Sequence, residues 1–176
     1  MRNDLPWMLP NTAFEWIEAN IASGGTILEF GSGEGSKRLA MTYSLYSVEH
    51  NPEWLNVSSG NYLYAPIKLN DEFNNEIGWY DLEPIKHELP TEIDLMIIDG
   101  PNGIIGRSGL LNHTDLFSWN FPVLIDDLHR EQEYLFSQHL SRKCRLKCIH
   151  YAHFGNKQDG TYRSYGVFSK KNRVDE

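Results

Sequence analysis

The sequence predicts an α/β fold in which parallel strands alternate with helices, and three observations support this prediction. An apolar run over residues 26–30 leads directly into closely spaced glycines. Two further apolar runs, over residues 93–98 and 121–125, each end in acidic residues. Buried parallel strands are almost continuously apolar, and glycine permits a sharp turn from a strand into a helix. At 176 residues, the chain is long enough for one domain with its own core.

The first half of the chain is expected to alternate helices and strands. Phe14 and Ile17 recur at helical spacing, with Asn11 or Thr12 as the cap of that helix. A further helix should follow the glycines. The other predicted elements are a helix over residues 11–21, strands over 26–30, 46–48 and 62–69, and a short helix over 53–58.

The second half begins with a polar connection over residues 70–90 that carries Trp79 and Tyr80. A connection of this length is unusual enough to suggest a function. Strands are expected over residues 93–98, 121–125, 146–151 and 162–168. A helix should begin near Leu128, with inward-facing side chains at Leu128, Leu135 and Phe136.

The glycines after the first strand are spaced Gly-x-Gly-x-Gly, at Gly31, Gly33 and Gly35. The dinucleotide fingerprint places its third glycine one position later, so this spacing favours S-adenosylmethionine over NAD. Backbone N–H groups at the start of the following helix can bind polar ligand atoms. A plain strand-to-loop turn is the alternative. Separately, the proline-marked residues 5–10 could either cover the cofactor cleft or plug the core.

Glu49 ends the second predicted strand, 18 positions after Gly31 (49 minus 31). A carboxylate at this place can accept hydrogen bonds from both ribose hydroxyls of an adenosine. NAD would use the same acid, so Glu49 does not separate the two cofactors. The alternative is a capping or solvent-facing acid, because Pro52 suits the first position of a helix. His50 would flank the adenosine pocket.

Asp99 and the pair Asp126-Asp127 end two further strands, so their carboxylates should meet at the carboxyl edge of the sheet. Their repulsion must be relieved by a proton, an arginine or a divalent cation. Capping of the next helix is the alternative for one of the pair. A cation would lower the pKa of an acceptor hydroxyl; without one, Asp99 or His129 could act as general base.

Arg107 and Arg130 lie near these acids in the sequence. They could clamp an anionic acceptor through bidentate hydrogen bonds, or they could neutralise Asp99 and Asp127 structurally. His129 follows the acidic pair, where a surface position is the alternative to a catalytic one.

The composition limits the classes of partner. The formal net charge of −8 argues against nucleic acid, because binding to a phosphate backbone needs a surplus of Lys and Arg. No apolar run is long enough to span a bilayer, and the start lacks the apolar core of a signal peptide. We expect a cytoplasmic protein without a membrane partner. Cys144 and Cys148, placed in a strand over residues 143–149, would lie roughly 13 Å apart and stay reduced.

These motifs together resemble the class I S-adenosylmethionine-dependent methyltransferases, and the resemblance covers most of the chain. It implies a three-layer Rossmann-like fold with a mostly parallel seven-stranded sheet and an antiparallel last strand. The motifs Asp99 to Gly103, Gly106-Arg107 and Asp127 to Arg130 with Glu133 resemble the plant glucuronoxylan O-methyltransferase and irregular-xylem group. The donor site implied is Glu29, Phe30, Gly31, Ser32, Gly33, Glu34, Gly35, Ser36, Glu49, His50, Asp99, Gly100 and Pro101.

Cation-dependent small-molecule O-methyltransferases carry one Asp after the fourth strand and an Asp-Asn pair after the fifth. Asp99 and Asp126-Asp127 are similar, although the second member of the pair is Asp and the lysine that follows the first Asp in that family is absent. The resemblance therefore implies Asp99, Asp126 and Asp127 as candidate metal ligands, and it implies a methyl donor more firmly than an acceptor.

We therefore expect an O-methyltransferase that acts on a small-molecule or sugar-like hydroxyl. Residues 1–176 should form a single domain, with residues 1–24 as an N-terminal segment and helix and residues 25–176 as the Rossmann-like core. A homo-oligomer could complete the cleft. The alternatives are a Rossmann-like binding or scaffold protein without catalysis and a nicotinamide-dependent oxidoreductase.

Overall fold

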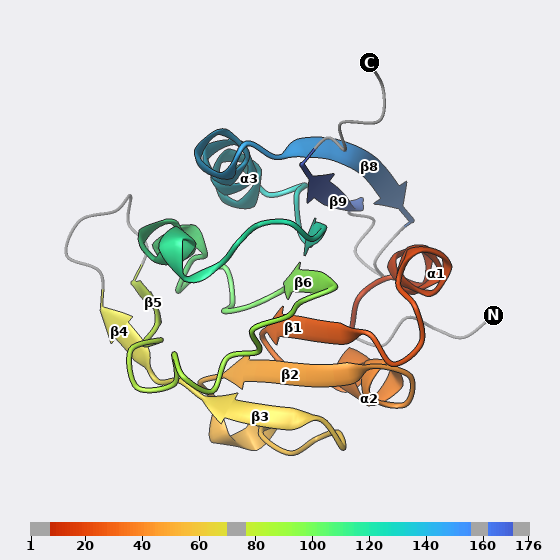
Figure 1. The fold of residues 1–176 in the computed structure, drawn as a ribbon. Coiled ribbons are helices and arrows are strands. Elements are labelled where there is room, and N and C mark those ends of the chain that lie inside the picture. The colour runs from red at the N-terminus through yellow and green to blue at the C-terminus, as the bar shows by residue number, and fades with distance from the viewer. Residues whose placement is uncertain (1–7, 70–76, 156–161, 171–176) are drawn as a thin grey trace.

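A computed structural model describes residues 8–69, 77–155 and 162–170 of the chain (Figure 1). Its centre is a seven-stranded sheet with the order β3-β2-β1-β6-β7-β9-β8. The strands of this sheet are β1 (Thr26–Phe30), β2 (Ser44–Glu49), β3 (Asn61–Tyr64), β6 (Leu95–Ile98), β7 (Val123–Ile125), β8 (Lys147–Phe154) and β9 (Arg163–Ser169). The helices are α1 (Asn11–Asn20), α2 (Glu34–Ala40) and α3 (Glu131–Cys144), with 3₁₀ segments η1 (Pro52–Trp54) and η2 (Ser108–Leu116).

The pairing of the strands confirms the predicted fold class. β1 pairs in parallel with β2 and β6, and β6 pairs in parallel with β7. β9 is antiparallel to both β7 and β8, so the last strand is reversed as expected. Phe30 is in register with Val48 and with Ile98. The segments that follow these three strands therefore start at the same edge of the sheet.

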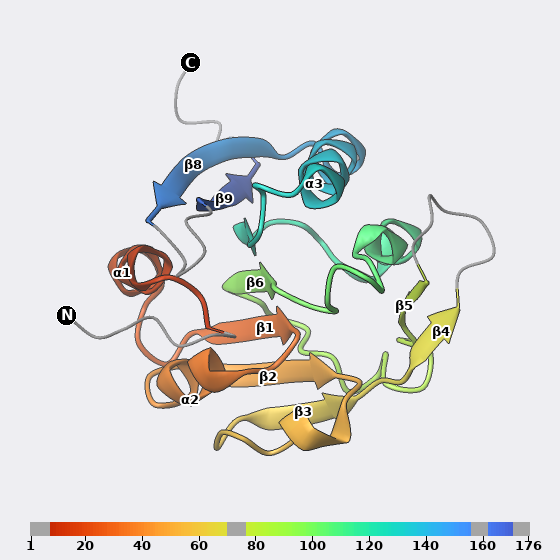
Figure 2. The same ribbon diagram turned by 180° about the vertical axis from the view of Figure 1, so that it is seen from behind.

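Two apolar clusters lie on the two faces of the sheet. One cluster includes Phe14 and Ile17 of α1 and Leu39 of α2, packed with side chains of the central strands. Figure 2 shows α2 lying over β1 and β2 on this side. The other cluster includes Phe136 of α3 and Leu110 of η2. The sheet is therefore the middle of three layers.

A second, two-stranded sheet lies beside the main one, and it corrects the predicted third strand. That strand was expected over residues 62–69, but it divides into β3 and β4 (Ile67–Leu69). β4 pairs antiparallel with β5 (Gly78–Tyr80). Trp79 and Tyr80 are buried, so this part of the predicted polar connection packs into the protein. Residues 70–76 lie outside the described residues.

The region after β7 also differs from the prediction. The helix begins at Glu131 rather than near Leu128, because Asp127 has a left-handed backbone (φ 61°) that interrupts regular structure. Leu128 and Phe136 are buried as expected, but Leu135 is 48% exposed. The final two strands are confirmed in place. The short helix expected over residues 53–58 is instead the 3₁₀ segment η1 (Pro52–Trp54).

The predicted strand over residues 143–149 is wrong in its first half, because only residues 147–149 belong to a strand. Cys144 is the last residue of α3, and Arg145 ends that helix in a left-handed conformation (φ 57°). Cys148 lies on β8, and both cysteines are free thiols.

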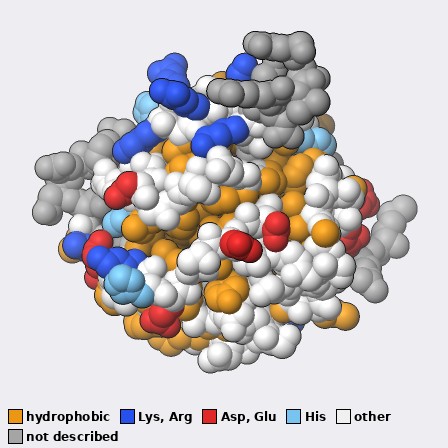
Figure 3. Space-filling view, in the orientation of Figure 1, with side chains coloured by type: hydrophobic (Ala, Val, Ile, Leu, Met, Phe, Trp, Pro, Cys, Tyr) orange, Lys and Arg blue, Asp and Glu red, His pale blue; other side chains and the backbone are white. Residues whose placement is uncertain are grey.

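Among the described helices, none has the length and apolar character that a membrane crossing requires. Figure 3 shows hydrophobic side chains in a band across the face seen in Figure 1, with Lys and Arg side chains gathered above it near α3 and β8.

Candidate functional site

The turn after β1 brings two strand ends into contact. Gly31 has a left-handed backbone (φ 91°), and its N–H donates to the carbonyl of Val48 at 3.0 Å. A Cβ on Gly31 would lie only 2.7 Å from the Cα of Gly100, two residues after β6. A side chain at either position would therefore push the two loops apart, and glycine is required on both steric and conformational grounds.

Glu49 is fixed at this turn by backbone N–H donors. The N–H of Ser32 donates to Oε2 at 2.9 Å, and the N–H groups of His50 and Asn51 donate to Oε1 at 2.7 Å each. The Glu49 side chain is 4% exposed. A carboxylate offers about four acceptor positions, so Oε2 keeps a position for a ligand hydroxyl. Glu49 therefore faces the glycine turn, as expected from the sequence.

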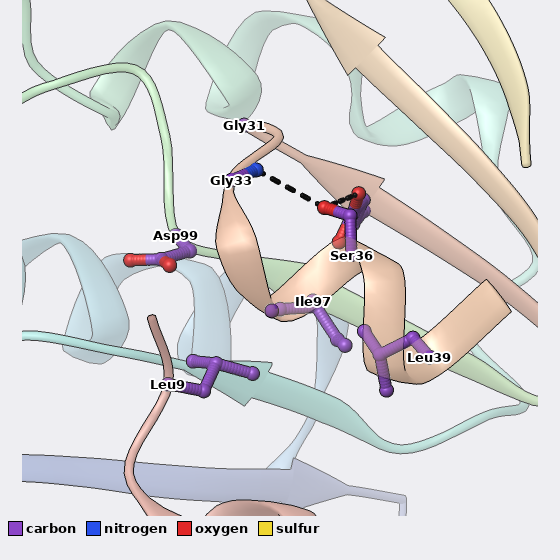
Figure 4. Close-up of a pocket in the computed structure, with 9 residues that line it drawn as sticks. Leu9, Gly31, Gly33, Ser36, Leu39, Ile97 and Asp99 are labelled. Carbon is purple, nitrogen blue, oxygen red and sulfur yellow. Dashed lines mark hydrogen bonds between the residues drawn. The ribbon is translucent and has the colours of Figure 1, made fainter. Parts of the chain in front are cut away.

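Glu29 lies beneath the start of α2. The hydroxyls of Ser36 and Ser47 each donate to its Oε1 at 2.6 Å, and the N–H of Gly33 donates to the Ser36 hydroxyl at 3.0 Å. Figure 4 shows Ser36 joined to Gly33 in this way. Burial raises the pKa of Glu29 to about 7, although the two serine hydrogen bonds act to lower it. This carboxyl group therefore titrates at a higher pH than an ordinary glutamate.

A small cavity lies beside Glu29, Gly31 and Asp99 (Figure 4). Its volume is about 10 Å³, enough for a single water, whereas ligand pockets are commonly some 300–1,000 Å³. The cavity is lined by Leu9, Glu29, Gly31, Gly33, Gly35, Ser36, Leu39, Ile97 and Asp99. Several of the predicted donor-site residues therefore lie together, but the cavity between them is too small for a nucleoside.

The segment before α1 closes the cavity. Leu9 is 4% exposed and lines the cavity beside Ile97 and Asp99. A Cβ on Gly35 would meet Met8 Cγ at 3.3 Å. The described part of the predicted cover, residues 8–10, thus lies against the glycine turn, and residues 1–7 fall outside the described residues. A ligand larger than a water could occupy this cavity only if the segment moved.

Tyr80 of β5 reaches the same edge of the sheet, a position that the motifs did not assign to the site. Its ring centroid is 5.7 Å from that of His50. A Cβ on Gly100 would lie 2.7 Å from the Tyr80 hydroxyl oxygen. His50 Nδ1 lies 3.0 Å from Glu49 Oε1 without making a hydrogen bond. The presence of aromatic residues in an unusually long connection was the one sequence signal for this contact.

The other acidic residues gather as expected. Carboxylate oxygens of Asp99, Asp126 and Asp127 lie within 4.8 Å of one another. Asp126 and Asp127 are buried, and the Asp99 side chain is 30% exposed. Glu133 of α3, 2% exposed, lies nearby, with its Oε1 3.6 Å from Arg130 Nη1.

Arginines surround this acidic cluster. Arg107 donates to the carboxylate of Asp127 at 3.1 Å. It also donates to the backbone carbonyls of Ile98, Asp99 and Asp126. Arg163 donates to Asp126 at 2.6 Å, and Arg130 lies 3.0 Å from Asp127. Arg163 was missed; the signal was its position at the start of the last strand, which an antiparallel pairing with β7 places beside Asp126.

The pKa values of the acids follow their surroundings. Burial raises the pKa of Asp126 to about 7, and repulsion from Asp99 and Asp127 adds to this shift. Burial also acts to raise the pKa of Asp127, but Arg107, Arg130 and Arg163 together hold it below its usual value. Burial raises the pKa of Asp99, opposed mainly by Arg107.

A divalent cation fits this donor set poorly. The three guanidinium groups already supply the positive charge that a cation would bring, and two of them contact Asp127 within 3.1 Å. A metal ion would have to compete with these cations for the same carboxylate oxygens. We therefore assign no chemical step to a metal at Asp99, Asp126 and Asp127.

The remaining candidate residues lie away from the cavity. Arg107 is 1% exposed and its bonds brace the loops after β6 and β7, so it offers no free face to an acceptor. His129 is exposed on the turn after Asp127. Phe30 is buried against Trp79, with ring centroids 5.3 Å apart, and Glu34 pairs with Lys37 on the outside of α2.

The strand order with a reversed β9, and the glycine turn facing the ends of β2 and β6, define a Rossmann-like methyltransferase fold. No family model matches the chain, and no curated protein sequence matches it. Solved structures do match it over nearly its whole length.

The chain is similar to three solved structures in particular. An O-methyltransferase from Bacillus cereus in complex with SAH has a TM-score of 0.65 at 12% identity, over 95% of this chain and 84% of that one. A putative RNA methyltransferase from Pyrococcus horikoshii has a TM-score of 0.60 at 15% identity, over 98% and 93%. A precorrin 8W decarboxylase from Methanobacterium thermoautotrophicum has a TM-score of 0.58 at 12% identity, over 97% and 96%. At these identities the likeness concerns the fold.

Proposed function

We propose that this chain is an S-adenosylmethionine-dependent methyltransferase, formed by one domain, that methylates a hydroxyl of a small-molecule or sugar-like acceptor. The observation that supports it most is the contact between the glycine turn and Glu49, through the N–H of Ser32 at 2.9 Å. Gly31 of the same turn lines a cavity with Asp99 at the carboxyl edge of the sheet, where ligands bind in open α/β folds.

The residues of the site fit the proposed donor once residues 8–10 move aside. Glu49 Oε2 would accept a hydrogen bond from a ribose hydroxyl, and the backbone of Gly33 and Gly35 would pass close to the amino-acid tail. Glu29 lines the cavity with a carboxyl group that a nearby cationic ligand would hold ionised. The bound donor would supply an electrophilic methyl group on a sulfonium.

Asp99 is the proposed general base. It lines the cavity and is partly exposed, and burial raises its pKa toward the range in which a carboxylate accepts protons well. Asp99 would take the proton of the acceptor hydroxyl while that oxygen bonds the methyl carbon and the carbon–sulfur bond breaks. Arg107 Nη2, 3.8 Å from Asp99 Oδ1, would hold the carboxylate in place. His129 is the alternative base.

The choice of a small acceptor rests on charge. The formal net charge of −8 disfavours a partner held through phosphates. Similar structures include an O-methyltransferase and a putative RNA methyltransferase, so the fold supports either kind of acceptor.

Calorimetric titration with S-adenosylmethionine and S-adenosylhomocysteine tests donor binding. We expect saturable binding by the parent protein and none by a Gly33→Trp variant, whose side chain would fill the turn. Absence of heat and of thermal stabilisation at millimolar ligand would exclude the proposal. In an acceptor screen, Asp99→Asn should lower the transfer rate by roughly 10²–10⁴-fold while retaining donor affinity.

A second candidate, a Rossmann-like binding or scaffold protein without catalysis, is favoured by one observation. The cavity, which Leu9 lines, is only about 10 Å³ and therefore too small for a nucleoside. Measurable methyl transfer by the parent protein, lost in Gly33→Trp together with donor affinity, would eliminate this candidate. Competition between NADH fluorescence and S-adenosylhomocysteine would separate both from a nicotinamide-dependent oxidoreductase.

A further inference from the structure

Tyr80 lies at the carboxyl edge of the main sheet but belongs to a strand outside that sheet. It is the last residue of β5, which pairs only with β4 in the two-stranded sheet. The N–H of the next residue, Asp81, donates to the carbonyl of Pro66 at 2.8 Å and fixes the end of the hairpin. The backbone of Tyr80 therefore belongs to the β4–β5 hairpin, whereas its ring packs against Phe30 of β1, with ring centroids 5.9 Å apart.

The Tyr80 hydroxyl lies where the loops of β1 and β6 touch. A Cβ on Gly100 would be 2.7 Å from this hydroxyl and also 2.7 Å from the Cα of Gly31. The Tyr80 ring lies edge-on to His50, which follows Glu49, at 5.7 Å between centroids. Tyr80 thus occupies the space between the end of β2 and the end of β6.

The hydroxyl of Tyr80 is buried and has no hydrogen-bond partner among the described residues. A buried hydroxyl without a partner is unfavourable, so such a group at a strand-end crevice needs an explanation. Burial and the nearby Glu49 raise the pKa of Tyr80 well above its usual value. The group therefore stays protonated near neutral pH and is available as a donor.

The position of Tyr80, more than its missing partner, carries the argument. Trp79 Nε1 is also buried without a partner, but the Trp79 ring packs against Phe30 at 5.3 Å in the core. Of these two buried groups, the Tyr80 hydroxyl lies next to Gly100, whereas Trp79 Nε1 does not. The Tyr80 side chain lies beside His50, the residue after Glu49, so its hydroxyl would be near a nucleoside whose ribose bonds Glu49.

We propose that the Tyr80 hydroxyl donates a hydrogen bond to a nitrogen or oxygen of the nucleoside part of the donor, which makes Tyr80 a specificity-determining residue of this site. This inference rests on the proposed function. It assigns a ligand contact to the β4–β5 hairpin, which lies outside the seven-stranded sheet.

The test is calorimetric titration of the full chain and its Tyr80→Phe variant with S-adenosylhomocysteine and with 5′-methylthioadenosine, which lacks the amino-acid tail. Tyr80→Phe removes only the hydroxyl, so we expect dissociation constants roughly tenfold higher for both ligands. The ligand-free variant should be as stable as the parent or more stable, because no internal hydrogen bond is lost. The matched control is Tyr43→Phe, a buried tyrosine before the opposite end of β2, which should leave both constants unchanged.

The outcomes separate this inference from the proposed function. If the parent binds both ligands and Tyr80→Phe binds them equally well, the assignment of Tyr80 is wrong and the proposed function stands. If the loss occurs with S-adenosylhomocysteine alone, the contact is to the tail and the nucleoside assignment is wrong. If the parent binds neither ligand, the proposed function fails and this inference fails with it.

Discussion

The carboxylates at the ends of β1 and β2 differ from those at the ends of β6 and β7 in how they are held. Glu29 and Glu49 accept hydrogen bonds from hydroxyl and backbone N–H groups. Asp126 and Asp127 are paired with arginine side chains. Neutral donors orient a carboxylate without cancelling its charge, whereas guanidinium groups cancel it. In the first region these hydrogen-bond donors are neutral and do not cancel the charge of the carboxylates, whereas in the second the arginines and aspartates form a network of ion pairs.

Both regions nevertheless contain one acid with a pKa near 7. Burial is the main cause at both Glu29 and Asp126. At Asp126 the repulsion of two neighbouring aspartates works against Arg163, whereas at Glu29 two serine hydroxyls work against burial. Burial therefore sets a similar titration range in both regions, and repulsion from Asp99 and Asp127 adds to it at Asp126.

The largest expected effect is on the stability of the protein when Arg107 is removed from its ion pair with Asp127. Arg107→Met would leave the buried carboxylate of Asp127 without one of its cations and three backbone carbonyls without a donor. Breaking a buried ion pair by removing one partner costs about 3–5 kcal/mol. Urea denaturation should show this loss in the free energy of unfolding. A loss under about 1 kcal/mol would mean that the network does not support the fold.

The next effect concerns Glu29 and pH. Its pKa is about 7 in the folded protein and about 4.5 in the unfolded chain. Between these values the folded state holds a proton that the unfolded state releases, so stability falls as pH rises and is constant above the folded pKa. The free energy of unfolding should therefore fall by about 3 kcal/mol as the pH rises through this range.

Glu29→Gln removes this titration. The stability of the variant relative to the parent should therefore rise by about 3 kcal/mol between pH 4.5 and 7.5, measured by urea denaturation across that range. The Asp126 titration is present in both proteins and cancels in the difference. A difference that does not change with pH would show that Glu29 titrates at its ordinary pKa.

A smaller effect is expected at Glu49. Glu49→Gln would replace a charged acceptor of the proposed ribose contact with a neutral one, and the dissociation constant for S-adenosylhomocysteine should rise roughly 10- to 100-fold. Asp94→Asn is the matched control, because Asp94 also accepts a backbone N–H, from Thr26 at 2.7 Å, at the other edge of the sheet. Equal constants for parent and Glu49→Gln would remove Glu49 from the site.

The smallest effect is expected at Arg130, which contacts the same carboxylate as Arg107. The Arg130 side chain is 40% exposed, whereas that of Arg107 is 1% exposed. Exposed ion pairs contribute about 0–1 kcal/mol, so Arg130→Met should destabilise far less than Arg107→Met. Denaturation midpoints of the two variants, measured side by side, check this order. Equal losses would show that burial does not decide the strength of these pairs.

The sequence predicted the regular core because its signals are local. Continuous apolar runs marked β1, β6 and β7, and the acids that follow them meet because parallel strands share one carboxyl edge. The glycine turn was recognisable because Gly31 needs both a left-handed backbone and a close approach to Gly100. The roles of the individual site residues stay predictions until ligand binding is measured.

Features that depend on distant contacts escaped the sequence. The break between β3 and β4 arises from pairing with β5, and the late start of α3 arises from the left-handed Asp127. Arg163 joins the acidic cluster across 37 positions in the chain. Leu135 is exposed because the buried face of α3 carries Phe136 and Leu140, and Leu135 lies off that face.

Leu9 lines the cavity of the proposed donor site, so the closed protein would compete with its own ligand for this space. If the donor binds there as proposed, residues 8–10 must move first, and the observed association rate should reach a plateau at high ligand concentration. If the open form were about 1% of the population, the apparent dissociation constant would be roughly 100-fold above the intrinsic one. Shortening Leu9 to alanine should therefore speed association before it alters anything in the bound state.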